Sequence, residues 1–299
     1  MNIGVIGTGQ IVISVLQATK AVKGMTWCAV YSRKQQTGET LAKQFHIPQV
    51  YTDLNCFLSD PAMDTVYIAS PNSLHYEQAK AALEHGKHVI VEKPFTSTLN
   101  EAQKLQKIAK QKHLFLLEAI TTRYLPNYHH IRQQLPCLGR LRLVQCCFSQ
   151  YSSRYPALLC GETPNIFHPK FSGGALQDIN LYNIQFVMGL FGAPITQTYY
   201  PNKHTNGIDT SGNGCMYVND KTNACSEVRM VLRDGSETCY REQKESRLYY
   251  EFCAMQDMIA SQNYEECWKQ LDVTMQVVAC MEIMRKDAGI YFAADKSDG

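Results

Sequence analysis

Apolar residues in the first 120 positions form short, often β-branched runs separated by segments with helical spacing. The runs are residues 3–6, 27–31, 65–68, 88–91 and 114–117, and helical periodicity fills 11–22, 37–45, 73–84 and 99–111. This alternation is typical of βαβ units, whose right-handed crossovers wind a parallel sheet with helices on both faces. The pattern predicts a doubly wound α/β domain.

The pattern changes near residue 141, where strand-like stretches become longer and fewer helices separate them. The stretches are 141–151, 214–218 and 228–232, with helical spacing from about residue 176 and over 271–286. Such a pattern predicts an α+β domain on a mainly antiparallel sheet. A length of 299 residues also suits two domains. We place them at 1–121 and 122–299, with the last helix free to pack on either one.

Composition narrows the range of partners. The chain is 45% hydrophobic and 19% charged, with a net charge of +2 and no basic run, which argues against nucleic acid or a membrane surface as partner. No segment approaches the roughly 18 apolar residues of a membrane span, and no secretory pattern precedes the first strand, so we expect a cytoplasmic protein. None of the twelve cysteines forms a Cys-x-x-Cys pair. We expect reduced thiols, no metal site and a small-molecule ligand.

The first predicted strand runs directly into Gly7-Thr8-Gly9-Gln10-Ile11-Val12, and a helix follows. In this context Gly7 allows a tight turn, and Gly9 lets a pyrophosphate approach the amides at the helix start, near Gln10 and Ile11. Val12 stands where the third glycine of such a loop is usual. We interpret the loop as a dinucleotide site of Rossmann type.

The end of the second predicted strand selects between the two nicotinamide cofactors. An NAD site usually has an acidic residue there, but this chain has Ser32-Arg33-Lys34. A hydroxyl and two cations hold a 2'-phosphate through charge-assisted hydrogen bonds, so NADP is favoured and NAD stays possible. The alternative is an exposed basic turn without a ligand.

Two further motifs supply reactive groups. Val91-Glu92-Lys93-Pro94 contains an ammonium, and the glycine pair Gly173-Gly174 precedes a helix that carries Asp178 and Tyr182 one turn apart on one face. Beside a dinucleotide loop, an ammonium, a carboxylate and a phenol point to hydride transfer. The alternatives are a surface role for Lys93, a helix-start role for Asp178 and a core position for Tyr182.

Together with Ser70-Pro71-Asn72-Ser73-Leu74-His75, these motifs resemble the glucose-fructose oxidoreductase and inositol dehydrogenase (Gfo/Idh/MocA) family over nearly the whole chain. The resemblance implies a Rossmann domain, a second domain whose open sheet often mediates homodimers or higher oligomers, and NAD(P)-linked chemistry on sugars, polyols or related alcohols. Lys93 matches the family's active-site lysine and Asp178 the aspartate of its substrate helix. The cofactor contacts that the motifs imply are Gly7, Gly9, Gln10, Ile11, Ser32, Arg33, Ser70, Pro71, Asn72, His75, Glu92 and Lys93.

Many members carry a histidine where this chain has Tyr182, which resembles the branch of glucose-fructose oxidoreductase and the dimeric dihydrodiol dehydrogenases, with tyrosine as acid/base. A free phenol ionises near pKa 10, so phenolate formation at pH 7 costs roughly 4 kcal/mol, which an adjacent ammonium reduces. Lys93, Asp178 and Tyr182 are therefore our predicted catalytic residues. Less specific pocket candidates are Arg123, Arg154, Asn165 and His168.

We thus expect an NADP-dependent oxidoreductase acting on a sugar, polyol or cyclic diol. Two alternatives remain open: a dinucleotide-sensing regulator on the same scaffold, and a reductase of heme pigments, which needs a broad apolar pocket. The stretch 217–249 is shorter than is usual for the resemblance. We therefore expect either a sheet without one hairpin or missing residues near 219–226.

Overall fold

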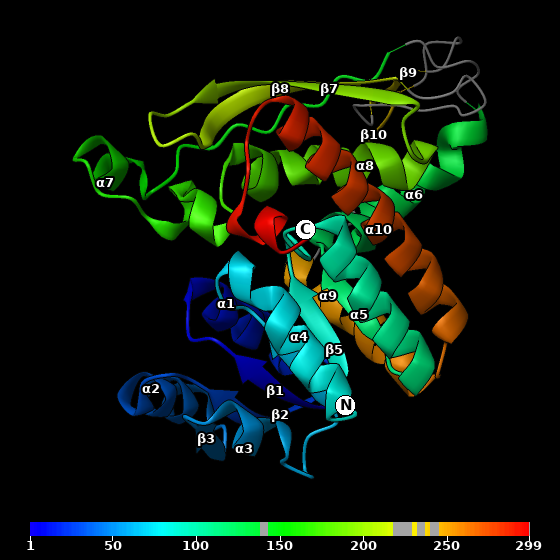
Figure 1. Cartoon of the computed structure of the whole chain (residues 1–299). Helices are drawn as coiled ribbons and strands as arrows, with labels where there is room; N and C mark the ends of the chain where they lie inside the picture. The colour runs from blue at the N-terminus through cyan, green and yellow to red at the C-terminus, as the bar shows by residue number, and fades with distance from the viewer. Residues whose placement is uncertain (138–142, 218–228, 232–236, 240–244, 299) are drawn as a thin grey trace.

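The computed structural model describes residues 1–137, 143–217, 229–231, 237–239 and 245–298. The first half forms a six-stranded parallel sheet in the order β3-β2-β1-β4-β5-β6, with helices on both faces (Figure 1). Its strands are β1 (Asn2–Ile6), β2 (Thr26–Tyr31), β3 (Gln49–Tyr51), β4 (Thr65–Ile68), β5 (His88–Glu92) and β6 (Leu116–Ala119). Its helices are α1 (Gln10–Ala18), α2 (Gln35–Phe45), α3 (Leu54–Leu58), α4 (His75–Glu84) and α5 (Leu99–Lys112).

This order confirms the predicted Rossmann topology. The central strands are buried on both faces, as Val5, Val66 and Ile90 show with no exposed surface, which explains their continuous apolar runs. The sequence patterns did not identify β3 and α3, because each is very short, and the last strand begins two residues later than predicted. All strands run parallel, but the strand order reverses between β1 and β4, so the carboxyl ends of these two strands define the ligand crevice.

The second half contains helices and two separate antiparallel strand pairs. The helices are α6 (Pro126–Gln134), α7 (Tyr155–Leu159), α8 (Leu181–Phe191), α9 (Arg247–Ala260) and α10 (Tyr264–Asp287), and a π turn covers Leu176–Asn180. The strand pairs are β7 (Thr196–Lys203) with β8 (Asp209–Tyr217), and β9 (Arg229–Val231) with β10 (Glu237–Cys239). Antiparallel pairing is confirmed, and the stretches 214–218 and 228–232 overlap β8 and β9.

The strand predicted at 141–151 is wrong for its described part, because residues 143–151 form no strand or helix. The alternating apolar residues Val144 and Cys146 instead pack against Val187 and Phe191 of α8. Alternation therefore reflects a segment that covers one helix face, and no described strand pairs with it. Residues 219–226, where we expected a gap or a missing hairpin, lie outside the described residues.

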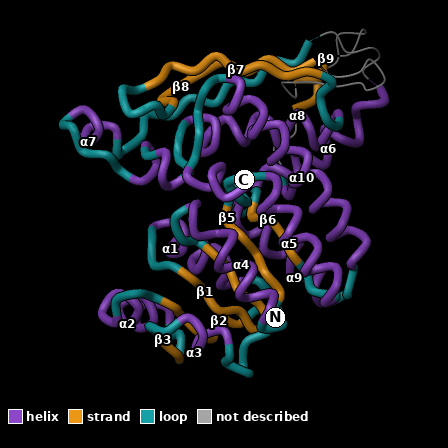
Figure 2. Tube along the Cα trace, in the orientation of Figure 1, coloured by secondary structure: helices purple, strands orange, loops and turns teal. Residues whose placement is uncertain are grey.

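Helices α9 and α10 pack on the Rossmann sheet, although they follow the antiparallel strands in the chain (Figure 2). Phe252 and Met255 of α9 share a core with Val5 and Val30. Helix α10 begins seven residues before the predicted start at residue 271, and it contacts α5, β6 and β7. The two halves thus share helices, and the boundary near residue 121 stays a prediction.

No helix in the described part of the chain is long and apolar enough to cross a bilayer. Within the same residues, no group of three or more His, Cys, Asp or Glu side chains is arranged to hold a metal ion.

Candidate active site

A cleft of about 800 Å³ lies at the carboxyl ends of β1, β2 and β4. The glycine loop forms its floor. Gly7 has φ +118°, and a Cβ there would meet the carbonyl oxygen of Ala69 at 2.6 Å, so only glycine fits. Gly9 is the N-cap of α1, and no atom lies within 4 Å of the position its Cβ would take. Its open surroundings and the amides of Gln10 and Ile11 suit an approaching pyrophosphate.

The basic turn after β2 lies at one end of this cleft. The side chain of Ser32 is 7% exposed, and its Oγ lies 2.7 Å from Thr37 Oγ1 and 3.0 Å from the carbonyl oxygen of Lys34. Ser32 therefore shapes the turn, while the exposed Arg33 and Lys34 face the cleft. Since no acidic residue among the described lining lies at this end, the turn fits a phosphate group.

The loop after β4 forms the opposite wall with Ser70, Pro71 and Asn72. Asn72 Nδ2 donates to the carbonyl oxygen of Ser172, 100 positions away, at 2.9 Å. His75 is 1% exposed and does not line the cleft. Its ring nitrogens lie 2.9 Å from the carbonyl oxygen of Pro94 and 3.0 Å from that of Ser70. His75 thus positions this wall from behind.

The three predicted catalytic residues meet in a smaller cleft of about 360 Å³ that shares Ile11, Ser70 and Asn72 with the larger one. Lys93 Nζ donates to Asp178 Oδ1 at 2.7 Å and to the carbonyl oxygen of Asp178 at 3.0 Å. The same ammonium lies 5.2 Å from the ring centre of Tyr182. An ammonium has three donors, so one N–H stays available for the oxygen of a ligand.

The turn that carries Asp178 is anchored by the β7–β8 hairpin. The amide of Leu176 donates to Asp209 Oδ2 at 2.7 Å, and Tyr199 Oη donates to the same oxygen at 2.7 Å. Gly174 has φ +105°, and a Cβ there would collide with Asp209. Gly174 is therefore needed for the close approach of the hairpin to the turn, while a Cβ on Gly173 would collide with the carbonyl oxygen of Ile166.

Opposing effects set the charges at this site. Burial raises the pKa of Tyr182, and although the Lys93 ammonium acts in the opposite direction, the net pKa is raised. Burial lowers the pKa of Lys93, but Tyr182 and the Asp178 carboxylate act in the opposite direction, and the net pKa of Lys93 is raised. Lys93 thus stays an ammonium at neutral pH and Tyr182 keeps its proton.

Glu92 lies directly behind the ammonium. Burial raises the pKa of Glu92, whose Oε1 accepts a hydrogen bond from Tyr67 Oη at 2.6 Å. Its other oxygen accepts from the backbone amide of Lys93 at 3.1 Å. Through this last hydrogen bond, Glu92 fixes the backbone of Lys93. It lines the smaller cleft but not the larger one.

Several lining residues were not among the predicted cofactor or catalytic contacts, although Thr8 and Lys34 belong to the motifs that predicted the site. Thr8, Lys34, Thr37 and Gln78 line the larger cleft, and Phe148, Gln150, Ile179 and Arg247 line the smaller one. Of the less specific candidates, Arg154 lines both clefts and Asn165 the larger one. Arg123 is buried and donates to the carbonyl oxygen of Gln270, and His168 caps a short turn. No sequence motif around Arg247 indicates a site, because the fold brings this residue to the smaller cleft from α9.

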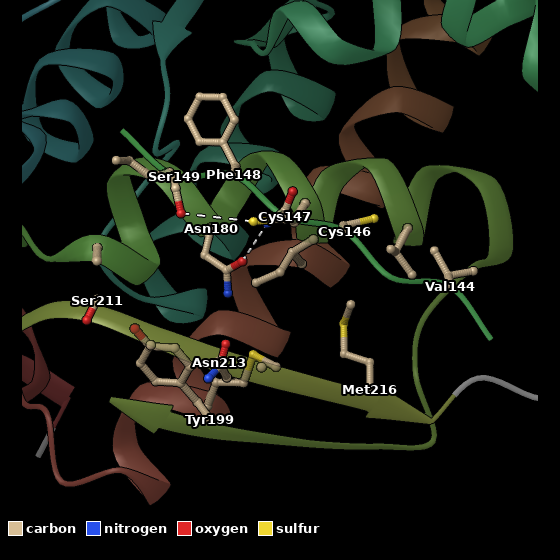
Figure 3. Close-up of a pocket in the computed structure, with 18 of the residues that line it drawn as sticks. Val144, Cys146, Cys147, Phe148, Ser149, Asn180, Tyr199, Ser211, Asn213 and Met216 are labelled. Carbon is tan, nitrogen blue, oxygen red and sulfur yellow. Dashed lines mark hydrogen bonds between the residues drawn. The ribbon is translucent and has the colours of Figure 1, made fainter. Parts of the chain in front are cut away.

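A third cavity, of about 840 Å³, lies beside the active site (Figure 3). It separates residues 143–151 and α8 from the β7–β8 hairpin, with Val144 and Cys146 on one side and Asn213 and Met216 on the other. Phe148, Gln150 and Ile179 line both this cavity and the smaller cleft. The Phe148 ring lies 5.5 Å from that of Tyr182, so this residue forms a partition between the two spaces.

The six-stranded sheet and its glycine loop define the class of Rossmann-fold oxidoreductases. Residues 1–119 match the family model described as "Oxidoreductase family, NAD-binding Rossmann fold" (GFO_IDH_MocA). The chain is 38% identical to the oxidoreductase YgjR of Escherichia coli over 212 residues, which are 71% of this chain and 65% of YgjR. It thus spans just under two thirds of that relative. Residues 1–119 thus form the NAD-binding Rossmann domain of the Gfo/Idh/MocA oxidoreductase family.

Two further comparisons extend over the whole chain. It is 29% identical to scyllo-inositol 2-dehydrogenase (NADP(+)) IolU of Bacillus subtilis over 327 positions, covering 99% of this chain and 100% of IolU. The structure of KijD10, a 3-ketoreductase from Actinomadura kijaniata in complex with NADP, has a TM-score of 0.73 at 18% identity and covers 96% of this chain and 97% of its own. This last likeness concerns the fold.

Proposed function

We propose that this protein is an NADP-dependent oxidoreductase that transfers a hydride between the nicotinamide and a sugar, polyol, cyclic diol or corresponding carbonyl compound. The observation that carries the proposal is the contact of Lys93 with Asp178 and Tyr182 in a cleft that opens into the dinucleotide crevice. The NADP(+) dependence in the names of IolU and of the D-xylose dehydrogenase of Hypocrea jecorina supports the cofactor. The basic turn at Arg33 supports it independently.

The proposed chemistry divides between the cofactor and the protein. The bound nicotinamide supplies or accepts the hydride. In reduction, Tyr182 donates its phenolic proton to the substrate oxygen, and the Lys93 ammonium stabilises the phenolate that remains. In oxidation, a Tyr182 phenolate accepts the hydroxyl proton. Asp178 holds Lys93 in place through the 2.7 Å contact.

This division of roles predicts a pH dependence with a definite sign. The raised pKa of Tyr182, caused by burial, keeps the proton donor loaded at neutral pH. Reduction should therefore proceed at neutral pH and slow only as the pH rises through that pKa. Oxidation should accelerate over the same range, and rate profiles for both directions would check the sign.

The decisive experiment is a spectrophotometric screen of NADPH and NADP against aldoses, ketoses, inositols, dicarbonyls and trans-diols. Tyr182→Phe should lower turnover on the order of a hundredfold or more and leave cofactor affinity nearly intact. Lys93→Ala should have at least as large an effect. Tyr200→Phe, on an exposed β7 tyrosine, is the matched control.

Two results would contradict the proposal. NADPH binding without turnover on any compound would favour the dinucleotide-sensing regulator. Near-normal turnover in Tyr182→Phe, with loss in Lys93→Ala, would assign proton transfer to the lysine.

We also propose that the protein acts in the cytoplasm and forms homodimers or higher homo-oligomers through its antiparallel strands. The sequence pattern supports the first proposal, and the resemblance described above supports the second. Light scattering of the purified chain would test the assembly, and a single protomer at micromolar concentration would contradict it. Cell fractionation would test the compartment.

A further inference from the structure

Two arginine side chains face the smaller cleft from different elements. Arg154 is the N-cap residue of α7, and Arg247 is the first residue of α9. Both are exposed and both line the cleft that contains Lys93 and Tyr182. The described residues offer neither guanidinium a hydrogen-bond or ion-pair partner. Two cations from segments more than ninety positions apart therefore converge on one small space.

The other charges of this cleft do not neutralise them. Asp178 is already paired with Lys93. Glu92 is buried with a raised pKa, because burial favours its neutral form, and both its oxygens already accept hydrogen bonds. Among the described residues that line this cleft, three side chains are cationic and two are acidic, and of these only Lys93 and Asp178 form a pair. An excess of positive charge faces the substrate.

The position of Arg247 relates this charge to the reacting group. Its positive charge acts on the Tyr182 phenol and lowers the pKa of that group, although burial dominates. Arg247 does not line the larger, dinucleotide cleft, whereas Arg154 lines both. The glycine loop and Arg33, which would hold the cofactor phosphates, lie in the larger cleft. These phosphates therefore do not account for the position of Arg247 in the smaller cleft.

We propose that Arg154 and Arg247 form an oxyanion-binding subsite and that the preferred substrate is a polyol or sugar bearing a carboxylate or a phosphate. The inference rests on the proposed function and adds its substrate class. A guanidinium matches either group, because its planar donors form paired hydrogen bonds with two oxygens of one anion. The cleft, at about 360 Å³, has room for one such compound beside Tyr182.

The test uses D-glucose, D-glucuronate and D-glucose 6-phosphate. These compounds share one sugar ring and differ only in the group at carbon 6. We expect kcat/KM, and affinity for the enzyme–NADPH complex measured by fluorescence quenching, to be at least about tenfold higher for one anion than for glucose. A preference for glucuronate would identify the bound oxyanion as a carboxylate, and a preference for glucose 6-phosphate would identify it as a phosphate. The preference should weaken with added salt, because screening acts on the charged pair alone.

Variants then assign the preference to residues. Arg247→Gln should lower kcat/KM for the preferred anion roughly ten- to a hundredfold more than for glucose, and Arg154→Gln should act in the same direction. Arg247→Lys should fall in between, since it keeps the charge but not the planar fork. Arg132→Gln, which removes an exposed cation of α6, is the control for net charge.

Three outcomes would overturn the inference: equal affinity for glucose and both anions, equal loss for all three compounds in Arg247→Gln, or a loss of NADPH affinity in place of substrate affinity. These results differ from failure of the proposed function. If glucose or another neutral compound is turned over without preference for an anion, the subsite alone is wrong. If the enzyme–NADPH complex turns over no compound and binds none, both are wrong.

Discussion

The larger cleft is built mainly from loops that follow strands of one sheet, whereas the proposed catalytic turn, Leu176–Asn180, is held by residues far along the chain. Gly7, Gly9 and Arg33 each follow a strand of one sheet, so their positions derive from the strand ends. Asp178 contacts Lys93 from 85 positions away, and its turn depends on Asp209 of the hairpin. Local pattern thus suffices for one site, while the other needs the whole fold.

This difference has a physical cause. Parallel strands place their carboxyl ends at one edge whatever lies elsewhere, so a loop after a strand reaches the crevice without further support. The π turn at Leu176–Asn180 has no such frame. Its first amide depends on Asp209, and the backbone before it is tied to the Rossmann half through Asn72 and Ser172. Changes in the second half should therefore couple stability to activity, and changes in the first should separate them.

The largest expected effect concerns a buried residue of α9, a helix of the second half that packs on the Rossmann core. Glu251 of α9 is fully buried, and neither of its carboxylate oxygens has a hydrogen-bond partner in the described residues. Burial, with a smaller contribution from the charge of Glu92, raises its pKa well above the ordinary value. The folded protein therefore holds a proton that the unfolded chain releases above a pH of about 4.3.

The sign of the pH dependence follows from that difference. As the pH rises from about 4.3 to the folded pKa, the free energy of unfolding should fall by up to about 1.4 kcal/mol per pH unit. Glu251→Gln removes this slope, so urea denaturation should show the variant gaining stability over the wild type with rising pH. Glu84→Gln, at an exposed carboxyl of α4, is the control. Parallel curves for Glu251→Gln and the wild type would mean that Glu251 is ionised in the folded state.

The next effect tests whether the catalytic turn depends on its distant anchor. Asp209→Ala leaves the amide of Leu176 and the hydroxyl of Tyr199 without their acceptor inside the protein. We expect a loss of about 2 to 4 kcal/mol in the free energy of unfolding and lower turnover. NADPH affinity should stay within about twofold, since the cleft of the first half does not contain Asp209.

Tyr199→Phe removes only one of the two hydrogen bonds and provides the graded comparison. Stability from urea midpoints, kcat and NADPH affinity should be measured for both variants. If Asp209→Ala weakened NADPH binding as strongly as turnover, the two halves would not differ in the way we describe.

The features that the sequence could predict are those with a local pattern, and the features that it could not predict depend on distant contacts. Five of the six parallel strands, the glycine loop and the basic turn were found, because each has a local pattern. The motif resemblance predicted Lys93, Asp178 and Tyr182 as catalytic residues, and the structure brings them together, but their spacing alone did not place Lys93 beside the other two. Arg247 was missed and a strand was wrongly predicted at 143–151, since both depend on contacts with distant elements. Alternating residues at 144–148 cover α8 as well as they would cover a sheet.

The smallest expected effect tests the independence of the cofactor cleft. Arg33→Ala removes one cation from an exposed turn, so it should lower NADP affinity roughly ten- to a hundredfold, or about 1.5 to 3 kcal/mol, by loss of a charge-assisted contact. NAD affinity should hardly change, because NAD has no 2'-phosphate, and the free energy of unfolding should stay within about 0.5 kcal/mol. Fluorescence titration measures the affinities for NADP and NAD, and urea denaturation measures the free energy of unfolding, with Arg132→Ala as the control for charge.

Equal or tighter binding of NAD by the wild type would show that the turn is only an exposed basic loop. A large loss of stability would show instead that this cleft, like the catalytic turn, depends on contacts beyond its own strand ends.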